Sequence, residues 1–442
     1  MAIASAKSQD MDVRAKWRAE NGLMNVMLSS LAGTTFEWYD YFLYGSAAAI
    51  VFPKLFFPHD SAFIAVLLSM ATYSVAFVTR PLGAAIFGHI GDRLGRRGTL
   101  IATMMLMGVG TTLIGLLPTY DSIGIAAPIL LVVLRFLQGV GLGGEWGGAS
   151  LMVGEVSEDG KRGWLTSLLQ EASPLGLLLA NGVFSLVTYS VSEDAFFSWG
   201  WRIPFLLSAI LVIIGLWLRV RVAESPLFEK AQAKEATVKY PFAEVFRNHK
   251  RSFILGVCSR IGSDVVFYAF NIMILVYGST KLGQPRELLF SAVLFGATGE
   301  ALGILLWGKL TDKLGRVPVL ITGAVACGIW VFAFFPLLAS SSVFLIFLAA
   351  FVGNFFHSAM WGPMASFIPE IFPTSVRYTG AGFTFQTAGV FGGALAPIIA
   401  TVLVNATGSW HAFAIYLVAT LVLLIVAVLL IGETKQVDFT RV

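Results

Sequence analysis

The chain alternates between long apolar runs and short polar connections. Twelve runs reach the roughly 20 apolar residues that a helix needs to cross the hydrocarbon core of a bilayer. They cover residues 24–52, 62–88, 98–117, 124–153, 164–190, 202–222, 252–280, 288–308, 318–339, 342–368, 379–404 and 410–431. The pattern predicts an all-α membrane protein with twelve transmembrane helices. Runs longer than about 25 residues indicate tilted helices or helices that extend past the lipid.

Composition agrees with this prediction, and the placement of charge gives the chain an orientation. Of the 442 residues, 57% are hydrophobic and 13% are charged, whereas a soluble domain carries roughly 25% charge. If the N-terminus is inside, 23 of the 30 Lys and Arg residues lie in inner segments. The outer loops hold only Lys54, Lys281 and Arg286, with Arg202 at a helix edge. This bias predicts that both termini are cytoplasmic.

The longest polar connection, residues 223–251, lies between the sixth and seventh runs. Its mixed charge is typical of a solvated cytoplasmic linker. It separates an N-terminal six-helix bundle, residues 24–222, from a C-terminal six-helix bundle, residues 252–431. Residues 1–23 and 432–442 are then cytoplasmic tails.

Three sequence features occur once in each bundle, in the same order. The segment Gly88–Arg97 is matched by Gly308–Val317, 220 positions later. Further matches join Glu155 and Arg162 to Glu370 and Arg377, and Trp201 and Glu224 to Trp410 and Glu433. Each match joins equivalent runs in the same orientation, which predicts two pseudo-symmetric halves. Such halves are typical of transporters whose substrate site lies near the bilayer midplane between them.

The sequence contains no motif of an enzyme or of a cofactor site. It has no His-Glu-x-x-His pair and no Gly-rich phosphate loop after a strand, so catalytic chemistry is not expected. Its two cysteines, Cys258 and Cys327, both lie in apolar runs, which predicts neither a disulfide framework nor a metal site. We therefore expect no cofactor other than a proton as the coupling ion.

At this point the chain resembles the major facilitator superfamily, because the Gly-x-x-x-Asp-Arg/Lys-x-Gly-Arg pattern of both loops is similar to that superfamily's signature. It is more narrowly similar to the metabolite:proton symporter family. The motifs that carry this resemblance are Phe36-Glu-Trp-Tyr-Asp40, Arg80-Pro-Leu-Gly83, Arg135-Phe-Leu-Gln-Gly139, Gly143-Gly-Glu-Trp-Gly-Gly148, Trp199-Gly-Trp-Arg-Ile-Pro-Phe205, Glu224-Ser-Pro-Leu-Phe-Glu229 and Pro369-Glu-Ile-Phe-Pro-Thr-Ser-Val-Arg-Tyr-Thr-Gly380. Within this family, the sequence most resembles carriers of shikimate-like carboxylates. The resemblance implies proton-coupled uptake of a small organic acid by alternating access, in the cytoplasmic (inner) membrane of a bacterium.

Two acids stand in the middle of the first apolar run. Glu37 and Asp40 are three residues apart, so they share a helix face with Tyr44. Asp40 and Arg135 both lie roughly 17 Å below the outer ends of their helices, at 1.5 Å per residue. A carboxylate and a guanidinium at one depth are a natural ion pair. The resemblance supports the pairing, because the sugar-porter branch of the superfamily uses a similar first-helix Asp and fourth-helix Arg for proton coupling.

An acid in this position can link proton movement to a change of conformation. Burial raises the pKa of a carboxyl group, whereas a nearby guanidinium lowers it. If the Arg contact exists in only some conformations, proton affinity changes as the carrier moves. We predict Asp40 as the proton-coupling acid, with Arg135 as its partner and Glu37 as a second acid nearer the inside. The alternative is a static ion pair that only holds two helices together.

The repeated loops are the predicted gates. Asp92 is expected to accept hydrogen bonds from the free N–H groups of a neighbouring helix N-terminus or to pair with a basic residue, and Gly88 to permit close approach. The loop arginines are expected to bridge to acids such as Glu155, although positive-inside topology alone could also account for them. The predicted gating residues are Gly88, Asp92, Arg93, Arg96, Arg97, Glu155, Arg162, Gly308, Asp312, Lys313, Arg316, Glu370 and Arg377.

Polar side chains deep in the apolar runs are candidates for the substrate site. Arg260 and Asp264 are four residues apart and could simply pair with each other, and His357 could be a satisfied core histidine. Glu171 and Glu300 fall outside the motifs, which suggests a role specific to this carrier's substrate. The predicted substrate-binding residues are Tyr44, Arg135, Gln138, Gln170, Arg260, Asp264, Asn354, His357, Trp361 and Gln386.

Other functions fit the same pattern less well. A carrier of zwitterionic osmolytes such as proline or betaine is the nearest alternative, but about eleven residues follow the last run and they lack the heptads of a coiled-coil extension. A non-transporting membrane sensor on this fold would be expected to lose the buried ions. The repeat and the paired loops disfavour an aqueous channel. The expected partners are the organic acid, protons and the lipid bilayer, with no nucleic acid, and we expect a monomer.

Overall fold

The computed structural model describes Trp17 and residues 22–58, 61–158, 160–224, 240–340 and 342–437. Most of the predicted tail 1–23, residues 225–239 of the predicted linker 223–251, and residues 438–442 of the predicted C-terminal tail lie outside the described residues. Within the described part every predicted apolar run is helical.

The first half of the chain, residues 22–224, consists of helices that follow the first six apolar runs closely. Its elements are α2 (Leu23–Ile50), α3 (Phe52–Phe56), α4 (Ala62–Leu94), α5 (Arg96–Leu116), α6 (Tyr120–Ile123), α7 (Ala126–Val156), α8 (Arg162–Ser167), η1 (Leu168–Glu171), α9 (Ala172–Ser190), α10 (Glu193–Ala195), η2 (Phe196–Gly200) and α11 (Arg202–Val220).

The second half, residues 240–437, opens with a short helix and then follows the last six runs. Its elements are α13 (Pro241–Asn248), α14 (Lys250–Tyr268), η3 (Ala269–Met273), α15 (Ile274–Thr280), α16 (Arg286–Leu314), α17 (Arg316–Leu338), α18 (Val343–Glu370), η4 (Thr374–Val376), α19 (Arg377–Ala388), η5 (Gly389–Ala394), α20 (Ala396–Thr407) and α21 (His411–Ile431).

Ten helical stretches within the described residues are long and apolar enough to cross a membrane. The first two predicted spans are not among the ten, although they correspond to helices α2 and α4 of 28 and 33 residues. At 1.5 Å per residue these helices are about 42 and 50 Å long. The helix α2 carries Glu37 and Asp40 near its centre, and these acids reduce its apolar character.

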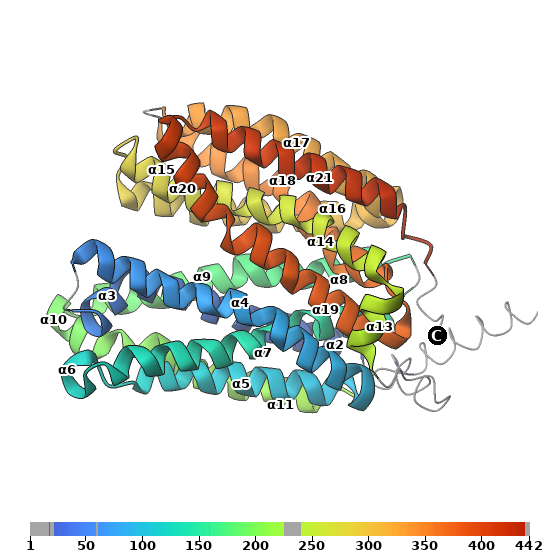
Figure 1. The fold of residues 1–442 in the computed structure, drawn as a ribbon, viewed down its shortest axis with the longest axis horizontal. Helices are drawn as coiled ribbons and strands as arrows, with labels where there is room; N and C mark the ends of the chain where they lie inside the picture. Colours follow the sequence, from blue (N-terminus) through green and yellow to red (C-terminus); the bar gives the residue numbers. More distant parts are fainter. Residues whose placement is uncertain are drawn as a thin grey trace, which may run out of the picture.

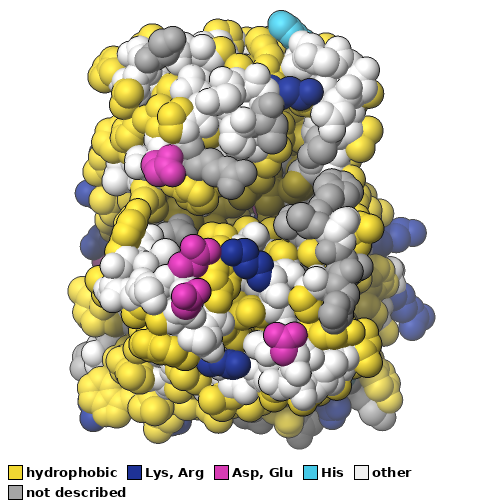
Figure 2. All heavy atoms as spheres, turned by 90° about the vertical axis from the view of Figure 1, so that its left-hand side faces the viewer, with side chains coloured by type: hydrophobic (Ala, Val, Ile, Leu, Met, Phe, Trp, Pro, Cys, Tyr) yellow, Lys and Arg dark blue, Asp and Glu magenta, His cyan; other side chains and the backbone are white. Residues whose placement is uncertain are grey.

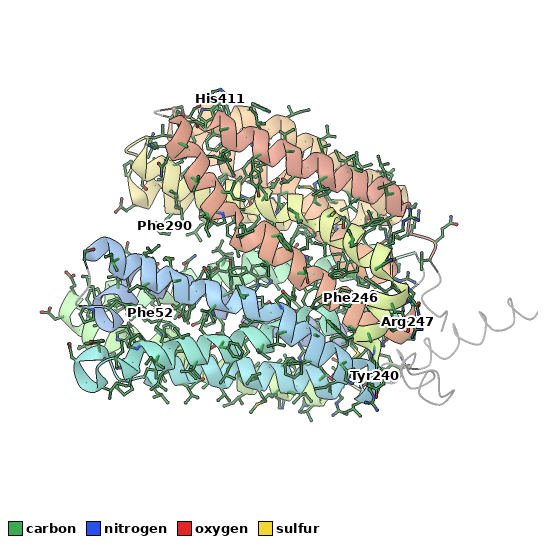
Figure 3. All side chains as sticks on the ribbon, in the orientation of Figure 1. Phe52, Tyr240, Phe246, Arg247, Phe290 and His411 are labelled. Carbon is green, nitrogen blue, oxygen red and sulfur yellow. The ribbon has the colours of Figure 1, made fainter. Side chains whose placement is uncertain are left out.

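The two halves lie side by side and differ in how closely they approach at their two ends (Figure 1). We call the end that carries Gly88–Arg97 and Gly308–Val317 the loop end. Tyr240, Phe246 and Arg247 also lie at that end, whereas Phe52 and Phe290 lie at the opposite, far end, one in each half (Figure 3). A view onto the far end shows a recess between the halves, with apolar side chains on the flanks (Figure 2).

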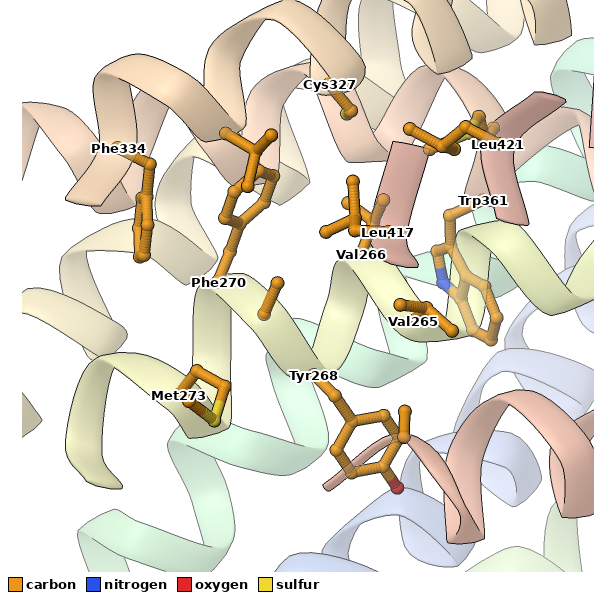
Figure 4. Close-up of a cluster of buried hydrophobic side chains, with 14 of the residues drawn as sticks. Val265, Val266, Tyr268, Phe270, Met273, Cys327, Phe334, Trp361, Leu417 and Leu421 are labelled. Carbon is orange, nitrogen blue, oxygen red and sulfur yellow. The ribbon is translucent and has the colours of Figure 1, made fainter. Parts of the chain in front are cut away.

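Each half has its own apolar core. The larger core cluster belongs mainly to the second half and includes Phe270, Cys327, Phe334 and Leu417, all fully buried (Figure 4). Tyr268 lies at the edge of this cluster and points toward the first half (Figure 4), where its hydroxyl is 2.7 Å from that of Tyr41. The cores therefore hold each bundle together, and both polar and aromatic groups make contacts between the bundles.

Candidate functional site

Asp40 lies in the interior of the first half, and hydroxyl groups from two neighbouring helices hold its carboxylate. Thr111 of α5 donates to Oδ2 at 2.6 Å, and Ser208 of α11 donates to Oδ1 at 3.0 Å. Hydrogen bonds to a charged group contribute about 1.5–3 kcal/mol each. The acid is thus part of the packing of three helices, and neutral donors rather than a cation are its immediate partners.

The predicted direct ion pair between Asp40 and Arg135 is not formed among the described residues. A relay of hydrogen bonds joins them instead. Gln138 Nε2 donates to the Thr111 hydroxyl at 2.6 Å, and Arg135 Nη1 donates to Gln138 Oε1 at 3.4 Å. The equal depth of Asp40 and Arg135 along their helices therefore placed both residues in one site. It could not show that Thr111 and Gln138 lie between the carboxylate and the guanidinium.

Arg135 is buried and has few hydrogen-bond partners. Its guanidinium lies 4.0 Å from the ring centre of Tyr44 and 5.3 Å from that of Tyr73. Within the described residues, its Nε and Nη2 atoms have no hydrogen-bond partner. Tyr44 itself bonds Thr72 at 2.6 Å. Aromatic faces stabilise the cation, and two of its nitrogens are left to bind an anion.

Glu37 occupies a separate position, one turn from Asp40 on α2. Its side chain is buried, and its Oε2 atom has no hydrogen-bond partner. It lies in the electrostatic field of Arg80 and Arg260, one from each half, and of the buried pair Glu145 and Arg219. The Arg80 guanidinium stacks 4.8 Å from the ring centre of Phe77, and its Nε also lacks a partner.

An aromatic layer joins the two halves near the middle of the molecule. Trp146 stacks on Phe385 with ring centres 3.4 Å apart, and its Nε1 donates to Gln170 Oε1 at 3.2 Å. Gln170 in turn donates to the Trp361 carbonyl at 3.1 Å. Trp146 therefore packs at the interface between the two halves. Gln170 and Trp361 are brought together across the interface.

Arg260 and Asp264 pair with each other, as their spacing allowed. Arg260 Nη2 lies 3.0 Å from Asp264 Oδ1. Arg260 also donates to the Phe385 carbonyl and lies over the Phe385 ring, 3.2 Å from its centre. The charge of this arginine is therefore already balanced within the second half, which makes it a weaker candidate for an anionic substrate than Arg135.

The other second-half candidates do not form one wall. Asn354 is fully buried and bonds Asn271 at 2.9 Å within its own half. Gln386 donates to the Leu142 carbonyl at 3.3 Å across the interface. His357 stacks near Trp361, with ring centres 6.0 Å apart. Only the histidine and Gln386 thus accompany Trp361 near the interface, and Asn354 stays in the core.

The loop end is closed by contacts of the predicted kind. Asp92 accepts from the backbone N–H groups of Tyr378 at 3.2 Å and Thr379 at 2.9 Å, and from the Thr379 hydroxyl at 2.8 Å. These N–H groups belong to the first turn of α19, where a carboxylate is favoured. A Cβ atom on Gly88 would lie only 2.8 Å from the Thr379 Cα, so glycine permits this approach.

The second loop repeats this arrangement in the opposite direction. Asp312 of the second half accepts from Gly163 N at 2.9 Å and Trp164 N at 2.7 Å, at the start of α8 in the first half. A Cβ atom on Gly308 would lie 2.8 Å from the Ser167 Cβ. The two contacts are related as the sequence repeat predicts, and each ties a loop of one half to a helix of the other.

Buried arginines support both loops. Arg96 pairs with Glu155, and Arg316 pairs with Glu370 at 3.0 Å. Glu370 also accepts from Arg162 of the other half at 3.2 Å. The bridging predicted for the loop arginines is therefore present in both halves. Arg377 Nε donates to the Phe372 carbonyl at 3.0 Å, within its own half.

Three further loop cations have different roles. Arg97 uses its backbone N–H to donate to Glu224 at 3.0 Å, and the equivalent carboxylate in the second half, Glu433, accepts from Arg316 N at 2.8 Å. Arg93 and Lys313 are exposed, and neither side chain has an ion pair in the described part of the chain. The positive charge of these two residues is therefore better explained by the positive-inside orientation of the chain than by a role in gating.

Residues missed by the sequence reasoning are mostly hydroxyl groups and one cation. Thr111 and Ser208 hold Asp40, yet isolated hydroxyls in apolar runs carry no pattern. Arg219, which lies near the end of the sixth apolar run, is 4% exposed and pairs with Glu145. The glycines around Glu145 and its depth in the fourth apolar run, helix α7, were the only sequence signals that it needed a cation.

Comparison with known proteins decides the family. Residues 26–240 match the family model "Sugar (and other) transporter", and residues 253–439 match "Major Facilitator Superfamily". The chain is 40% identical over 437 residues to the inner membrane metabolite transport protein YhjE of Escherichia coli, covering 98% of this chain and 99% of that protein. The chain belongs to the major facilitator superfamily. It is a multi-pass integral protein of the inner membrane and a metabolite transporter, not an enzyme.

Further relatives within this superfamily carry different substrates. The chain is 39% identical to the shikimate transporter of E. coli, with 92% of this chain and 94% of that one covered. It is 33% identical to the proline/betaine transporter of E. coli, with 94% and 84% covered. Among solved structures, the proton:xylose symporter XylE bound to 6-bromo-6-deoxy-D-glucose superposes with a TM-score of 0.76 at 19% identity, covering 95% and 98%. That likeness establishes the fold.

Proposed function

We propose that this transporter carries a small organic acid into the cell together with protons, by alternating access. The observation that carries the proposal is the relay from Asp40 through Thr111 and Gln138 to Arg135. It joins an acid able to hold a proton to a cation with two unpartnered nitrogens. A proton site and an anion site that share one hydrogen-bond relay are the parts that symport needs.

The conformation supports alternating access. Polar contacts between the halves cluster at the loop end, through Asp92 and Asp312, while the far end is recessed (Figure 2). With the loop end cytoplasmic, as the charge distribution predicts, this is an outward-facing conformation. A substrate would then enter through the recess and reach the Arg135 side of the relay.

Coupling follows from the arrangement around Asp40. Two hydroxyl donors hold the carboxylate, and the oxygen that takes up a proton, such as the Oδ2 bound by Thr111, then needs an acceptor in place of a donor. Protonation therefore rearranges Thr111, and through it Gln138 and Arg135. The guanidinium is then released to bind the carboxylate of the substrate. Return of the empty carrier requires the proton to leave, which restores the relay shown here.

An anionic substrate fits the available charge. Arg135 and Arg80 both have nitrogens without protein partners, whereas Arg260 is balanced by Asp264. The 39% identity to a shikimate transporter supports a hydroxylated carboxylate. The 33% identity to a proline/betaine transporter supports a zwitterion as the second candidate.

The proposal is tested by uptake into proteoliposomes under an inward proton gradient, with internal pH recorded. Shikimate, 2-oxoglutarate, citrate, simple monocarboxylates and betaine are compared. We expect concentrative uptake of one or more acids with acidification of the lumen. The variant Arg135→Gln should lose this uptake, whereas Arg221→Gln, which removes an exposed cation stacked on Trp217, should not. Uptake of betaine alone would establish the second candidate instead.

A further inference from the structure

A group of titratable side chains that the relay does not use lies where the two halves meet. Glu300 of α16 is 2% exposed, and its Oε1 atom lies 3.8 Å from Nδ1 of His357 on α18. In the part of the chain that the structure describes, neither of these two atoms has a hydrogen-bond partner. Glu171 lies at the end of η1 in the first half, which packs against α16, and its charge acts on Glu300. Its Oε1 atom is also buried and unpartnered.

The cations around this group are already engaged. Of the charged side chains on the elements packed against α16 and α18, Arg260 pairs with Asp264, and Arg162 and Arg316 pair with Glu370. Lys309 lies over the Trp164 ring, and Asp312 binds the start of α8. Within the described residues, no lysine or arginine forms an ion pair with Glu171 or Glu300.

A carboxylate in an apolar interior without a paired cation is costly to ionise, and the negative charge of Glu171 raises that cost for Glu300, so a proton is favoured there. The imidazole of His357 is a second group near Glu300 that can hold or share this proton. Its Nε2 atom lies 3.2 Å from the Ser263 hydroxyl. If Ser263 donates to Nε2, then Nδ1 carries the hydrogen and faces Glu300; if Ser263 accepts, Nδ1 can accept from a protonated Glu300.

We propose that Glu171, Glu300 and His357 form a second proton-binding site, distinct from Asp40 and assembled only when the two halves meet at the loop end. Glu171 comes from the first half, and the other two residues come from the second. Opening of the loop end parts them and admits water, so the proton leaves on that side. The site takes up a proton in the conformation seen here and releases it in the opposite one.

This inference rests on the proposed symport, because it adds a proton to each transport cycle. The substitution Glu300→Gln keeps the shape of the side chain and removes its ability to ionise. We expect the number of protons moved per substrate to fall by one, while substrate exchange across the membrane without a gradient continues. Glu171→Gln should have the same effect. Glu287→Gln, an exposed acid on the same helix, is the matched control and should keep the wild-type ratio.

A second measurement does not depend on transport. Infrared spectroscopy of the purified wild-type protein should show a protonated-carboxyl band, stable from acidic to neutral buffer, that Glu300→Gln removes or reduces and Glu287→Gln leaves unchanged. An unchanged band in Glu300→Gln, or an unchanged proton-to-substrate ratio in a variant that transports, would overturn the second site. Wild-type uptake without any proton movement would overturn the proposed symport instead, and the infrared result would then decide the protonation of Glu300 alone.

Discussion

Asp40 is held by hydroxyl groups that a charge-based reading of the sequence does not find. The carboxylate of this residue depends on Thr111 and Ser208, and its link to Arg135 passes through Gln138. Because Thr111 donates to Asp40 and accepts from Gln138, this one hydroxyl connects the proton site to the cation. The function of the pair therefore depends on a neutral residue of α5.

Replacement of Thr111 by valine tests the relay at a single side chain. Thr111→Val keeps the volume and removes both hydrogen bonds, and a lost bond to a charged group is worth about 1.5–3 kcal/mol. We expect proton-driven uptake to fall roughly tenfold or more, since about 1.4 kcal/mol is a factor of ten. Thr112→Val, whose hydroxyl bonds only its own helix at Gly108, should stay within about twofold. Equal rates in the two variants would contradict the relay.

The buried pair Arg219–Glu145 supports a prediction about stability. Removal of one partner leaves the other charge buried and unpaired, which costs about 3–5 kcal/mol, whereas apolar replacement of both is far less harmful. Arg219→Met should therefore lower the thermal unfolding temperature of the purified protein clearly. The double variant Glu145→Leu/Arg219→Met should recover most of the loss. A single variant as stable as wild type would show that the pair contributes little.

At the level of helices, the sequence repeat predicted equivalent loop contacts in the two halves, and the structure contains them. Asp92 and Asp312 each bind the first turn of a helix in the other half, and Glu224 and Glu433 each bind N–H groups at the start of α5 and α17. Free N–H groups at helix starts favour such carboxylates. The two loop contacts thus act as equivalent latches on one end of the molecule.

Loss of both latches should change the distance between the halves at the far end. We expect Asp92→Asn/Asp312→Asn to weaken the charge-assisted bonds and to shift the population away from the conformation seen here. Spin labels at Lys54→Cys and Lys281→Cys, with Cys258→Ser and Cys327→Ala, should then report shorter distances. Arg93→Gln removes an exposed cation from the same loop and should leave the distribution unchanged. If the spin-label distances are the same with and without Asp92→Asn/Asp312→Asn, the two loop contacts do not act as latches.

The apolar pattern was sufficient for the helices but not for the contacts between them. Most run boundaries agree with helix ends within a few residues because hydrophobic length determines both, whereas α4 and α16 each extend six residues past their runs at the loop end. Depth along a helix could also be estimated, and it brought Asp40 and Arg135 into one site. The rotation of a helix about its axis and the identity of its neighbours could not be estimated from the sequence. Thr111, Ser208 and the partner of Glu145 were therefore missed. Asn354 shows the same limit. It was predicted to bind substrate, but its side chain contacts Asn271 within the second half rather than the interface.

In the whole molecule, the latches and the group formed by Glu171, Glu300 and His357 lie at different levels between the two halves. Contacts at the loop end close one side, and the recess leaves the other side open (Figure 2). The relay around Asp40 lies within the first half, while Glu300 and His357 meet Glu171 across the interface. Movement of the halves would therefore act on the interface group directly and on Asp40 through the substrate bound at Arg135.

The most direct test compares two modes of transport in the same proteoliposomes containing Asp40→Asn. Asparagine cannot ionise, so we expect gradient-driven accumulation of the acid to disappear while exchange of substrate across the membrane persists. Asp121→Asn, at an exposed acid of the far end, should retain both modes. Full proton-driven accumulation in Asp40→Asn would contradict the assignment of Asp40 as the coupling acid.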